Sequence, residues 1–282
     1  MANSEIETLC YGYGLIEGPR VDTEGNLYFS DVPNGGVYRR SPDGEITTAI
    51  AKRRGVGGIA LHADGGLVVS GRNICHVRDG VTRIVFDPGA PGFNDIMTDA
   101  EGRVWCGTIR SDPFASQNRH PGEAYRIPTQ RPGGEVELMY KPVSLTNGIG
   151  FSPDGARIYH SDTAINAVIR HDLEDDKAVN RHELAPAGPR FNPDGLAVDE
   201  QGMLWVADYG SGCVRGIDPE NGNEVERIEV PAVEVTSVAF GGTERTHLYI
   251  TTADNTDDPE RGGTIFRTKV QVPGLEVPLA RV

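Results

Sequence analysis

Four oxygen-bearing side chains recur at one position of this chain. Glu17, Asn94, Asn147 and Asp194 each lie eight residues before a glycine that follows an acidic or polar residue. Carboxylates and amides are the hard oxygen donors that divalent cations such as Ca²⁺ prefer. If the fold brings these positions together, the two carboxylates repel each other, and a cation relieves that repulsion. The spacing therefore predicts a divalent-metal site, and a polar, water-filled channel is the alternative.

Two further units place different residues at the same position. Gly57 stands eight residues before Gly65, and alignment of the sixth unit with the fifth puts Thr236 there. The six residues should form a ring around one axis, and the set contains no aliphatic side chain. Gly57 should leave a gap that admits water or a substrate oxygen. An open coordination position is typical of a catalytic metal rather than a structural one.

The elements that must position these residues form a repeat. A strand, an Asp-Gly-like turn and a second strand recur in phrases that begin at Val21, Leu61, Thr98, Phe151, Val198 and, less clearly, Phe240. Asp-Gly and Glu-Gly pairs are typical of tight hairpins. A second hairpin should follow each phrase, from Gly36, Ile74, Ala124, Val168, Val214 and Ile265. Six units of four antiparallel strands predict an all-β, six-bladed β-propeller that occupies residues 1–282 as a single domain.

Two segments need separate interpretation. Residues 164–185 contain no Gly or Pro and could locally form a helix, but their place in the repeat predicts strand, turn and strand. Ile6 to Tyr11 precede the first full unit, and we expect them to supply the outermost strand of the last blade. That arrangement would join the two ends of the chain.

Composition excludes several classes of protein. The formal charge of −14, from 27 basic and 41 acidic residues, argues against nucleic acid as a partner. No apolar run approaches the roughly 18 residues of a membrane helix, and the first residues do not resemble a signal peptide. We expect a cytoplasmic protein, a monomer or small homo-oligomer. The four scattered cysteines should be free, buried thiols rather than disulfides or zinc ligands.

The chain resembles the senescence marker protein/gluconolactonase family, also called regucalcin-like, whose members are six-bladed propeller lactonases. Five segments carry the resemblance: LIEGP at 15–19, FND at 93–95, LTNGIGFSPDG at 145–155, NPDGLAVD at 192–199 and the ending GGTIFRTKVQVPGL at 262–275. The resemblance implies that Glu17, Asn147 and Asp194 bind one divalent metal ion. It also implies that Asn94 contacts water on that ion or the substrate, and that Asp194 helps to activate water. Ca²⁺ is the expected ion, with Mg²⁺, Mn²⁺ or Zn²⁺ as alternatives.

One position departs from the family's pattern. Members that act on sugar lactones usually carry Arg two residues before the asparagine of the Asn-Asp motif, and this chain has Gly92 there. Loss of a bidentate donor should leave a wider, less polar mouth. The departure favours a more apolar lactone or ester over an aldonolactone.

An insertion between Arg110 and Pro121 should form a loop over the metal face. Its side chains Arg110, Phe114, Arg119 and His120 are candidates for substrate contacts, and a solvated surface loop is the alternative. Other polar residues have no assigned chemistry: His76 and His160 should pack within strands, Asp95 and Asp162 should support the ring or its turns, and Tyr209 and Asn255 lie near strand ends.

The predicted reaction is hydrolysis of a small-molecule lactone or ester by metal-activated water. The cation, held by Glu17, Asn147 and Asp194, would polarise the carbonyl. Water oriented by Asn94 and deprotonated with help from Asp194 would attack it. The chain has no Gly-x-Ser-x-Gly motif, which disfavours a serine hydrolase. Two alternatives remain: an organophosphate or fluorophosphate hydrolase with the same metal ligands, and a non-catalytic calcium-binding propeller.

Overall fold

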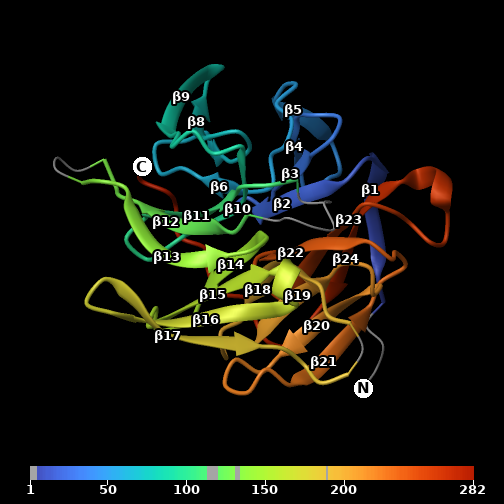
Figure 1. The fold of residues 1–282 in the computed structure, drawn as a ribbon. Helices are drawn as coiled ribbons and strands as arrows, with labels where there is room; N and C mark the ends of the chain where they lie inside the picture. The colour runs from blue at the N-terminus through green and yellow to red at the C-terminus, as the bar shows by residue number, and fades with distance from the viewer. Residues whose placement is uncertain (1–4, 113–119, 131–133, 189) are drawn as a thin grey trace.

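The computed structural model describes residues 5–112, 120–130, 134–188 and 190–282. Its described residues form six four-stranded antiparallel sheets. The sheets stand around a common centre as the blades of a six-bladed β-propeller, which confirms the predicted fold (Figure 1). None of the described residues belongs to a helix long and apolar enough to cross a membrane.

Each blade begins with an inner strand near the centre of the ring (Figure 1). The inner strands are β2 (Ile16–Val21), β6 (Ile59–Leu61), β10 (Gly92–Thr98), β14 (Thr146–Phe151), β18 (Pro193–Val198) and β22 (Val235–Gly241). The second strands are β3 (Leu27–Asp31), β7 (Leu67–Val69), β11 (Val104–Ile109), β15 (Arg157–Asp162), β19 (Leu204–Asp208) and β23 (His247–Thr252). We number the blades 1 to 6 in this order.

The third and fourth strands complete each blade toward the rim. The third strands are β4 (Val37–Arg40), β8 (Ile74–Arg78), β12 (Gly122–Ile127), β16 (Ala167–Glu174), β20 (Cys213–Ile217) and β24 (Gly263–Lys269). The outer strands are β5 (Ile46–Ile50), β9 (Val81–Phe86), β13 (Glu137–Val143), β17 (Lys177–Leu184), β21 (Glu224–Glu229) and β1 (Glu7–Tyr13). Two short 3₁₀ helices, η1 (Thr163–Ile165) and η2 (Pro259–Arg261), lie in loops.

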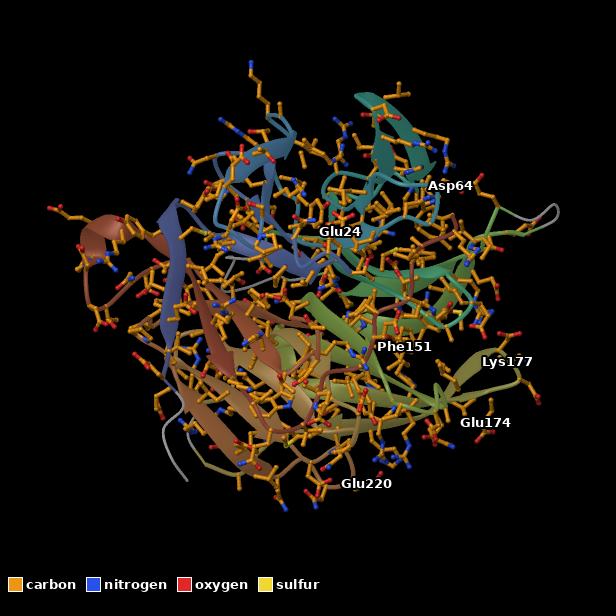
Figure 2. The ribbon with its side chains drawn as sticks, turned by 180° about the vertical axis from the view of Figure 1, so that it is seen from behind. Glu24, Asp64, Phe151, Glu174, Lys177 and Glu220 are labelled. Carbon is orange, nitrogen blue, oxygen red and sulfur yellow. The ribbon has the colours of Figure 1, made fainter. Side chains whose placement is uncertain are left out.

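The turns between first and second strands explain the repeated sequence phrase. In three blades an aspartate, Asp22, Asp99 or Asp199, accepts hydrogen bonds from the turn's backbone N–H groups. Asp99 and Asp199 also accept from the indole N–H of a buried tryptophan, at 2.8 and 3.1 Å. Each of these aspartates therefore pairs the free backbone N–H groups of a tight turn, and two of them also hold a tryptophan side chain in the core beneath the turn. Figure 2 shows the molecule from behind, with Glu24 and Asp64 labelled in two of these turns.

The sixth blade closes the ring with both ends of the chain. Strand β1 pairs with β24, so the prediction for the N-terminal segment is confirmed. The second hairpin expected from Ile265 is wrong, because β1 already occupies the outer edge of β24. Residues 270–282 instead leave the blade: Glu200 N–H donates to the Pro273 carbonyl, and Ala63 N–H donates to the Ala280 carbonyl, both at 2.9 Å. This tail therefore ties blade 6 to blades 5 and 2.

Two other predictions about the chain are confirmed. Segment 164–185 forms β16 and β17 rather than a long helix, and Figure 2 shows their turn, marked by Glu174 and Lys177, at the edge of the molecule. All four cysteines are free and buried. Burial raises the pKa of Cys106 far above its usual range, so its thiol stays protonated.

Candidate metal centre

The residues predicted from the repeat lie at the start of the inner strands. Glu17, Asn147 and Asp194 are each the second residue of their strand, β2, β14 and β18, and Asn94 is the third residue of β10. The side chains of Glu17, Asn147 and Asp194 are nearly buried, with 7, 8 and 7 % exposed. The repeat therefore places these residues at one end of the propeller.

Glycines after the ring positions let neighbouring inner strands approach closely. A Cβ on Gly58 would lie 2.4 Å from the Ile96 nitrogen, and one on Gly148 would lie 2.3 Å from the Leu196 nitrogen. Such separations are sterically forbidden, so any larger residue would force the strands apart. Glycine at these positions is therefore what allows side chains from different blades to reach one another.

Three aspartates fix the loops that lead into the predicted metal ligands. Asp31, Asp162 and Asp208 end β3, β15 and β19, and each pairs in register with the residue just before Glu17, Asn147 or Asp194. We call them the anchor aspartates. Their carboxylates accept backbone N–H groups two or three residues before the ligand: Gly14 at 3.2 Å, Ser144 and Leu145 at 2.6 and 2.9 Å, and Asn192 at 2.8 Å.

Blades 2 and 3 have no anchor aspartate at the same position. The repeat puts Gly71 there in blade 2, and Thr108 pairs with Phe93 in blade 3. The Thr108 hydroxyl donates to Glu123 at 2.6 Å instead of holding the loop before β10. Blade 6 has Thr252 at this position, and Asp254, two residues later, accepts the N–H groups of Val233 and Glu234.

Three carboxylates share the buried end of the channel. Burial raises the pKa of Glu17 well above its usual value, and the charges of Asp194 and Asp95 raise it further. Burial and Asp95 also raise the pKa of Asp194. Burial raises the pKa of Asp95 to about 6, although Arg20 opposes that shift. The site is thus an electrostatically strained, acidic centre that a cation would stabilise.

One of the predicted metal ligands has a carboxylate oxygen without a partner. Among the described residues, Oδ1 of Asp194 is buried and accepts no hydrogen bond. Glu17 receives only a long contact, 3.4 Å from the N–H of Gly18 to its Oε2. Buried carboxylate oxygens are normally paired, and an unpaired one leaves its desolvation uncompensated. The oxygen donors of this ring therefore fit a hard divalent cation.

Two asparagines from adjacent blades bond to each other. Asn94 Nδ2 donates to the side-chain oxygen of Asn147 and, at 3.0 Å, to the Thr146 carbonyl. Nδ2 of Asn147 donates to the Thr163 hydroxyl at 2.7 Å, which leaves its Oδ1 directed toward Asn94. Because an amide oxygen has two lone pairs, Asn147 Oδ1 retains acceptor capacity for a metal ion.

Two expectations about the ring need correction. The gap expected at Gly57 is partly filled, because Asn94 Oδ1 lies 1.9 Å from where a Cβ of Gly57 would stand. Thr236 was expected to face the channel, yet it is fully buried. Its hydroxyl donates to the Ile16 carbonyl at 2.6 Å and lies 2.9 Å from the Thr251 hydroxyl. Thr236 therefore joins blade 6 to blade 1, and its buried hydroxyl is already bonded to Ile16 and close to Thr251.

Sequence reasoning missed Arg20. Its guanidinium is buried, and Nη2 reaches from blade 1 to Asp95 in blade 3, at 3.3 Å from Oδ1 and 2.8 Å from the Ile96 carbonyl. A signal was present: three residues after the ring positions the other five units carry Ala60, Met97, Gly150, Ala197 and Ala239. A single charged residue in an otherwise small or apolar set indicates a specific partner.

The donor set explains why acidic clustering alone does not reveal this centre. Within the described part of the chain, no three His, Cys, Asp or Glu side chains are grouped as metal ligands. The ring combines the carboxylates of Glu17 and Asp194 with the amide of Asn147. Oxygen donors of this mixed kind suit Ca²⁺ better than the thiolates and imidazoles that zinc prefers.

The predicted mouth of the site, at Gly92 and the insertion after β11, belongs to blade 3. Gly92 pairs with Ile109, so the insertion that follows β11 lies at the same end as Asn94. Among the described residues, which do not include 113–119, a Cβ on Gly92 would meet only the Gly71 carbonyl, at 3.6 Å, which is ordinary contact. Arg110 forms a 2.9 Å ion pair with Glu123. The backbone N–H of His120 donates to the Ser111 hydroxyl at 2.7 Å. Phe114 and Arg119 lie outside the described residues.

The remaining polar candidates have structural partners. His160 lies 2.7 Å from the Tyr140 hydroxyl and from the Thr146 hydroxyl, and burial lowers its pKa to about 3. His76 stacks on His62 with ring centroids 3.9 Å apart. Asn255 accepts backbone N–H groups before η2 and donates to Thr264. Burial and the charge of Glu234 raise the pKa of Tyr209. The expectation that His76 and His160 pack within strands is confirmed.

A surface cavity lies away from this centre. It has a volume of about 610 Å³ and is lined by residues of blades 1 and 2, including Tyr28, His62 and Arg78. One of its acidic residues, Asp22, already binds the backbone and side chain of Asn26. None of the described residues that line the cavity has a buried side-chain oxygen without a hydrogen-bond partner, in contrast to Asp194.

Comparison with known proteins agrees with this architecture. Residues 15–254 match the model of the SMP-30/Gluconolactonase/LRE-like region. The pentonolactonase of Haloferax volcanii is 32 % identical, with 95 % of this chain and 94 % of that protein covered. The 6-deoxy-6-sulfogluconolactonase of Pseudomonas putida is also 32 % identical, with 90 % of each covered.

Solved structures share the fold over its full length. A luciferin-regenerating enzyme superimposes with a TM-score of 0.87 at 25 % identity, covering 99 % of this chain and 100 % of that one. Regucalcin from Agrobacterium tumefaciens, described as a calcium-binding protein, gives 0.84 at 24 % identity, covering 99 % and 98 %. The six-bladed ring is thus common to all of them.

Proposed function

We propose a metal-dependent lactone hydrolysis for this chain, which belongs to the SMP-30/Gluconolactonase/LRE-like family. The observation that carries the proposal is the buried, unpaired Oδ1 of Asp194 beside the carboxylate of Glu17. Glu17, Asn147 and Asp194 would hold one divalent ion, and Ca²⁺ is our first choice among Ca²⁺, Mg²⁺, Mn²⁺ and Zn²⁺. When bound, such an ion supplies Lewis-acid polarisation of an ester carbonyl.

The side chains of the ring can perform the proton transfers of ester hydrolysis. Asn94 stands beside Asn147 and can orient a water molecule through its amide. Asp194 would accept one proton of that water as its oxygen bonds to the lactone carbonyl carbon. A carboxylate within reach of the attacking water can serve as its general base.

Ring opening completes the reaction without another reactant. As the tetrahedral adduct collapses, the bond between the carbonyl carbon and the ring oxygen breaks. The departing oxygen takes the proton back from Asp194, and the product is an open-chain hydroxy acid. Asp194 therefore ends the cycle ionised, as it began.

The relatives support a lactone substrate, and Gly92 supports our proposal about its polarity. Both relatives described above are named for the lactones of sugars or sulfosugars. In this chain Gly92 offers no side-chain donor at the mouth, and Arg110 is engaged by Glu123. We therefore propose a lactone substrate with few hydroxyl groups near the reacting carbonyl.

The test combines metal removal with a substrate panel. Purified protein is stripped with a chelator, and kcat/KM is measured for alkyl lactones, gluconolactone and a phosphotriester before and after Ca²⁺ is restored. We expect lactone hydrolysis that disappears with the metal and returns with it. Full lactonase rates without detectable metal would contradict the metal site. Turnover of the phosphotriester alone would identify an organophosphate hydrolase, and tight metal binding without turnover would identify a binding propeller.

A further inference from the structure

Arg20 is a cation built into the acidic end of the channel. Three groups hold its guanidinium: Nη1 donates to the Pro19 carbonyl at 2.7 Å, and Nη2 donates to the Ile96 carbonyl at 2.8 Å and to Asp95 at 3.3 Å. Arg20 and Asp95 are 5 and 3 % exposed. The two carbonyl contacts keep the guanidinium in place independently of its ion pair.

The Arg20–Asp95 ion pair leaves some of its hydrogen-bonding atoms without partners, which is unusual for an ion pair that serves only to join two blades. Among the described residues, Nε of Arg20 and Oδ2 of Asp95 are buried and have no hydrogen-bond partner. Replacing a buried ion pair by apolar side chains often costs little stability, so stability alone does not account for it. Its distinguishing property is the charge it places next to the ring, because Arg20 lies three residues after Glu17 in β2 and Asp95 directly follows Asn94 in β10.

The charges at this end of the channel can be counted. Glu17, Asp95 and Asp194 contribute three negative charges when ionised, and Arg20 contributes one positive charge, which leaves a net charge of −2. One divalent cation makes the centre neutral. Without Arg20 the net charge is −3, which matches a trivalent ion, and without the charge of Asp95 it is −1.

We propose that the Arg20–Asp95 pair sets the valence of the ion that the ring accepts, by fixing the charge around Glu17 and Asp194 at the value one divalent cation neutralises. The pair is a specificity-determining element that touches neither the ion nor the substrate. This inference rests on the proposed function, because it presupposes the metal site. It extends that proposal by assigning selectivity between ions to two residues outside the ligand set.

The test compares two ions of similar radius and different charge, Ca²⁺ and Tb³⁺. Dissociation constants are measured by titration calorimetry for the wild type, Arg20→Met, Asp95→Asn and the double variant Arg20→Met/Asp95→Asn. We expect the preference for Tb³⁺ over Ca²⁺ to rise at least about tenfold in Arg20→Met and to fall by a similar factor in Asp95→Asn. The double variant has the wild-type net charge, so its preference should return to within about threefold of the wild type.

A purely structural pair gives a different pattern. Both single variants would then weaken the binding of both ions to the same extent, so the preference for Tb³⁺ over Ca²⁺ would not change. The double variant would not restore the lost affinity. That result would overturn the inference and leave the metal site in place. If Arg20→Met does not fold, as judged by circular dichroism, Asp95→Asn and the double variant still decide between the two patterns. A wild type that binds neither ion would refute the proposed function itself, and the inference with it.

Discussion

The two sides of the ring are built differently. In blades 1, 4 and 5 an anchor aspartate ends the second strand and binds the loop that leads into Glu17, Asn147 or Asp194. In blades 2 and 3 the same position holds Gly71 or Thr108, and the ring positions are Gly57, two residues before β6, and Asn94 in β10. The loops that lead into the proposed ligands are therefore held by an aspartate at this position, and the described residues of blades 2 and 3 have no carboxylate there.

This difference separates two tasks. A metal site needs ligands held within a fraction of an ångström, and buried carboxylate–amide hydrogen bonds supply that rigidity. A substrate mouth has to fit ligands of different shape, and glycine at 92 leaves room for them, because a Cβ there would make only an ordinary contact with the described residues. We expect changes on the anchored side to alter metal affinity and changes on the open side to alter substrate choice.

The largest effect should come from a ligand on the anchored side. Asp194→Ala removes one of the two carboxylates, and we expect metal affinity to fall more than about a hundredfold, since even residues that only support a metal ligand contribute tenfold to a hundredfold. Lactonase activity should vanish while the blades stay folded. Titration calorimetry and circular dichroism measure the two outcomes.

The matched change on the open side is Asn94→Ala. It should lower kcat with a much smaller loss of metal affinity, because Asn94 is proposed to orient water rather than to bind the ion. Equal losses of metal affinity in Asp194→Ala and Asn94→Ala would show that the two sides of the ring do not differ in their contribution to metal binding.

An anchor aspartate should have the next largest effect. Asp162→Ala leaves the N–H groups of Ser144 and Leu145 without their acceptor, so Asn147 loses its fixed position. We expect a loss of about tenfold to a hundredfold in metal affinity. Thr108→Val, at the same position in blade 3, is the control: it should cost some stability and leave the metal dissociation constant unchanged. An identical change in metal affinity from both variants would show that anchoring is not specific to the ligand blades.

A change at the mouth should alter substrate preference alone. Gly92→Arg adds a donor where a Cβ meets only an ordinary contact. A charged hydrogen bond to a substrate hydroxyl should raise kcat/KM for gluconolactone relative to an alkyl lactone by at least about tenfold. Metal affinity should not change. A wild type that already prefers gluconolactone strongly would contradict the proposed substrate class.

The smallest effect concerns pH. Because the folded chain raises the pKa of Glu17 and Asp194, it holds protons that the unfolded chain has released. The unfolded state thus binds fewer protons, and the free energy of unfolding contributed by these groups falls as pH rises from about 5 to 7. For the metal-free protein we expect this to lower Tm by about 2–4 °C relative to Asp194→Asn, which lacks one of the titrating groups and retains Asp95 and Arg20. No difference between the two proteins would contradict the charge repulsion inferred for the ring.

The sequence by itself predicted the architecture and the ring, because both follow from local periodicity. Asp-Gly turns define hairpins, hairpins define the repeat, and equivalent positions of a repeat lie at equivalent places in the ring. Glu17, Asn147 and Asp194 were found by counting back from the turn glycines. The closing strand β1 was predicted because Ile6 to Tyr11 precede the first full unit, whereas the repeat wrongly predicted a further hairpin from Ile265.

Only the tertiary structure decided which side chains of the ring are free to bind a metal ion and which already bond to another blade. Thr236 occupies a ring position in the sequence, but its hydroxyl bonds to blade 1. The gap at Gly57 is partly filled by Asn94 from the next blade, and Arg20 finds its partner 75 residues away. Contacts of this kind depend on the distance between blades and on the direction of each side chain. A repeat specifies equivalent backbone positions, whereas the partner of each side chain is set by the blade packed beside it.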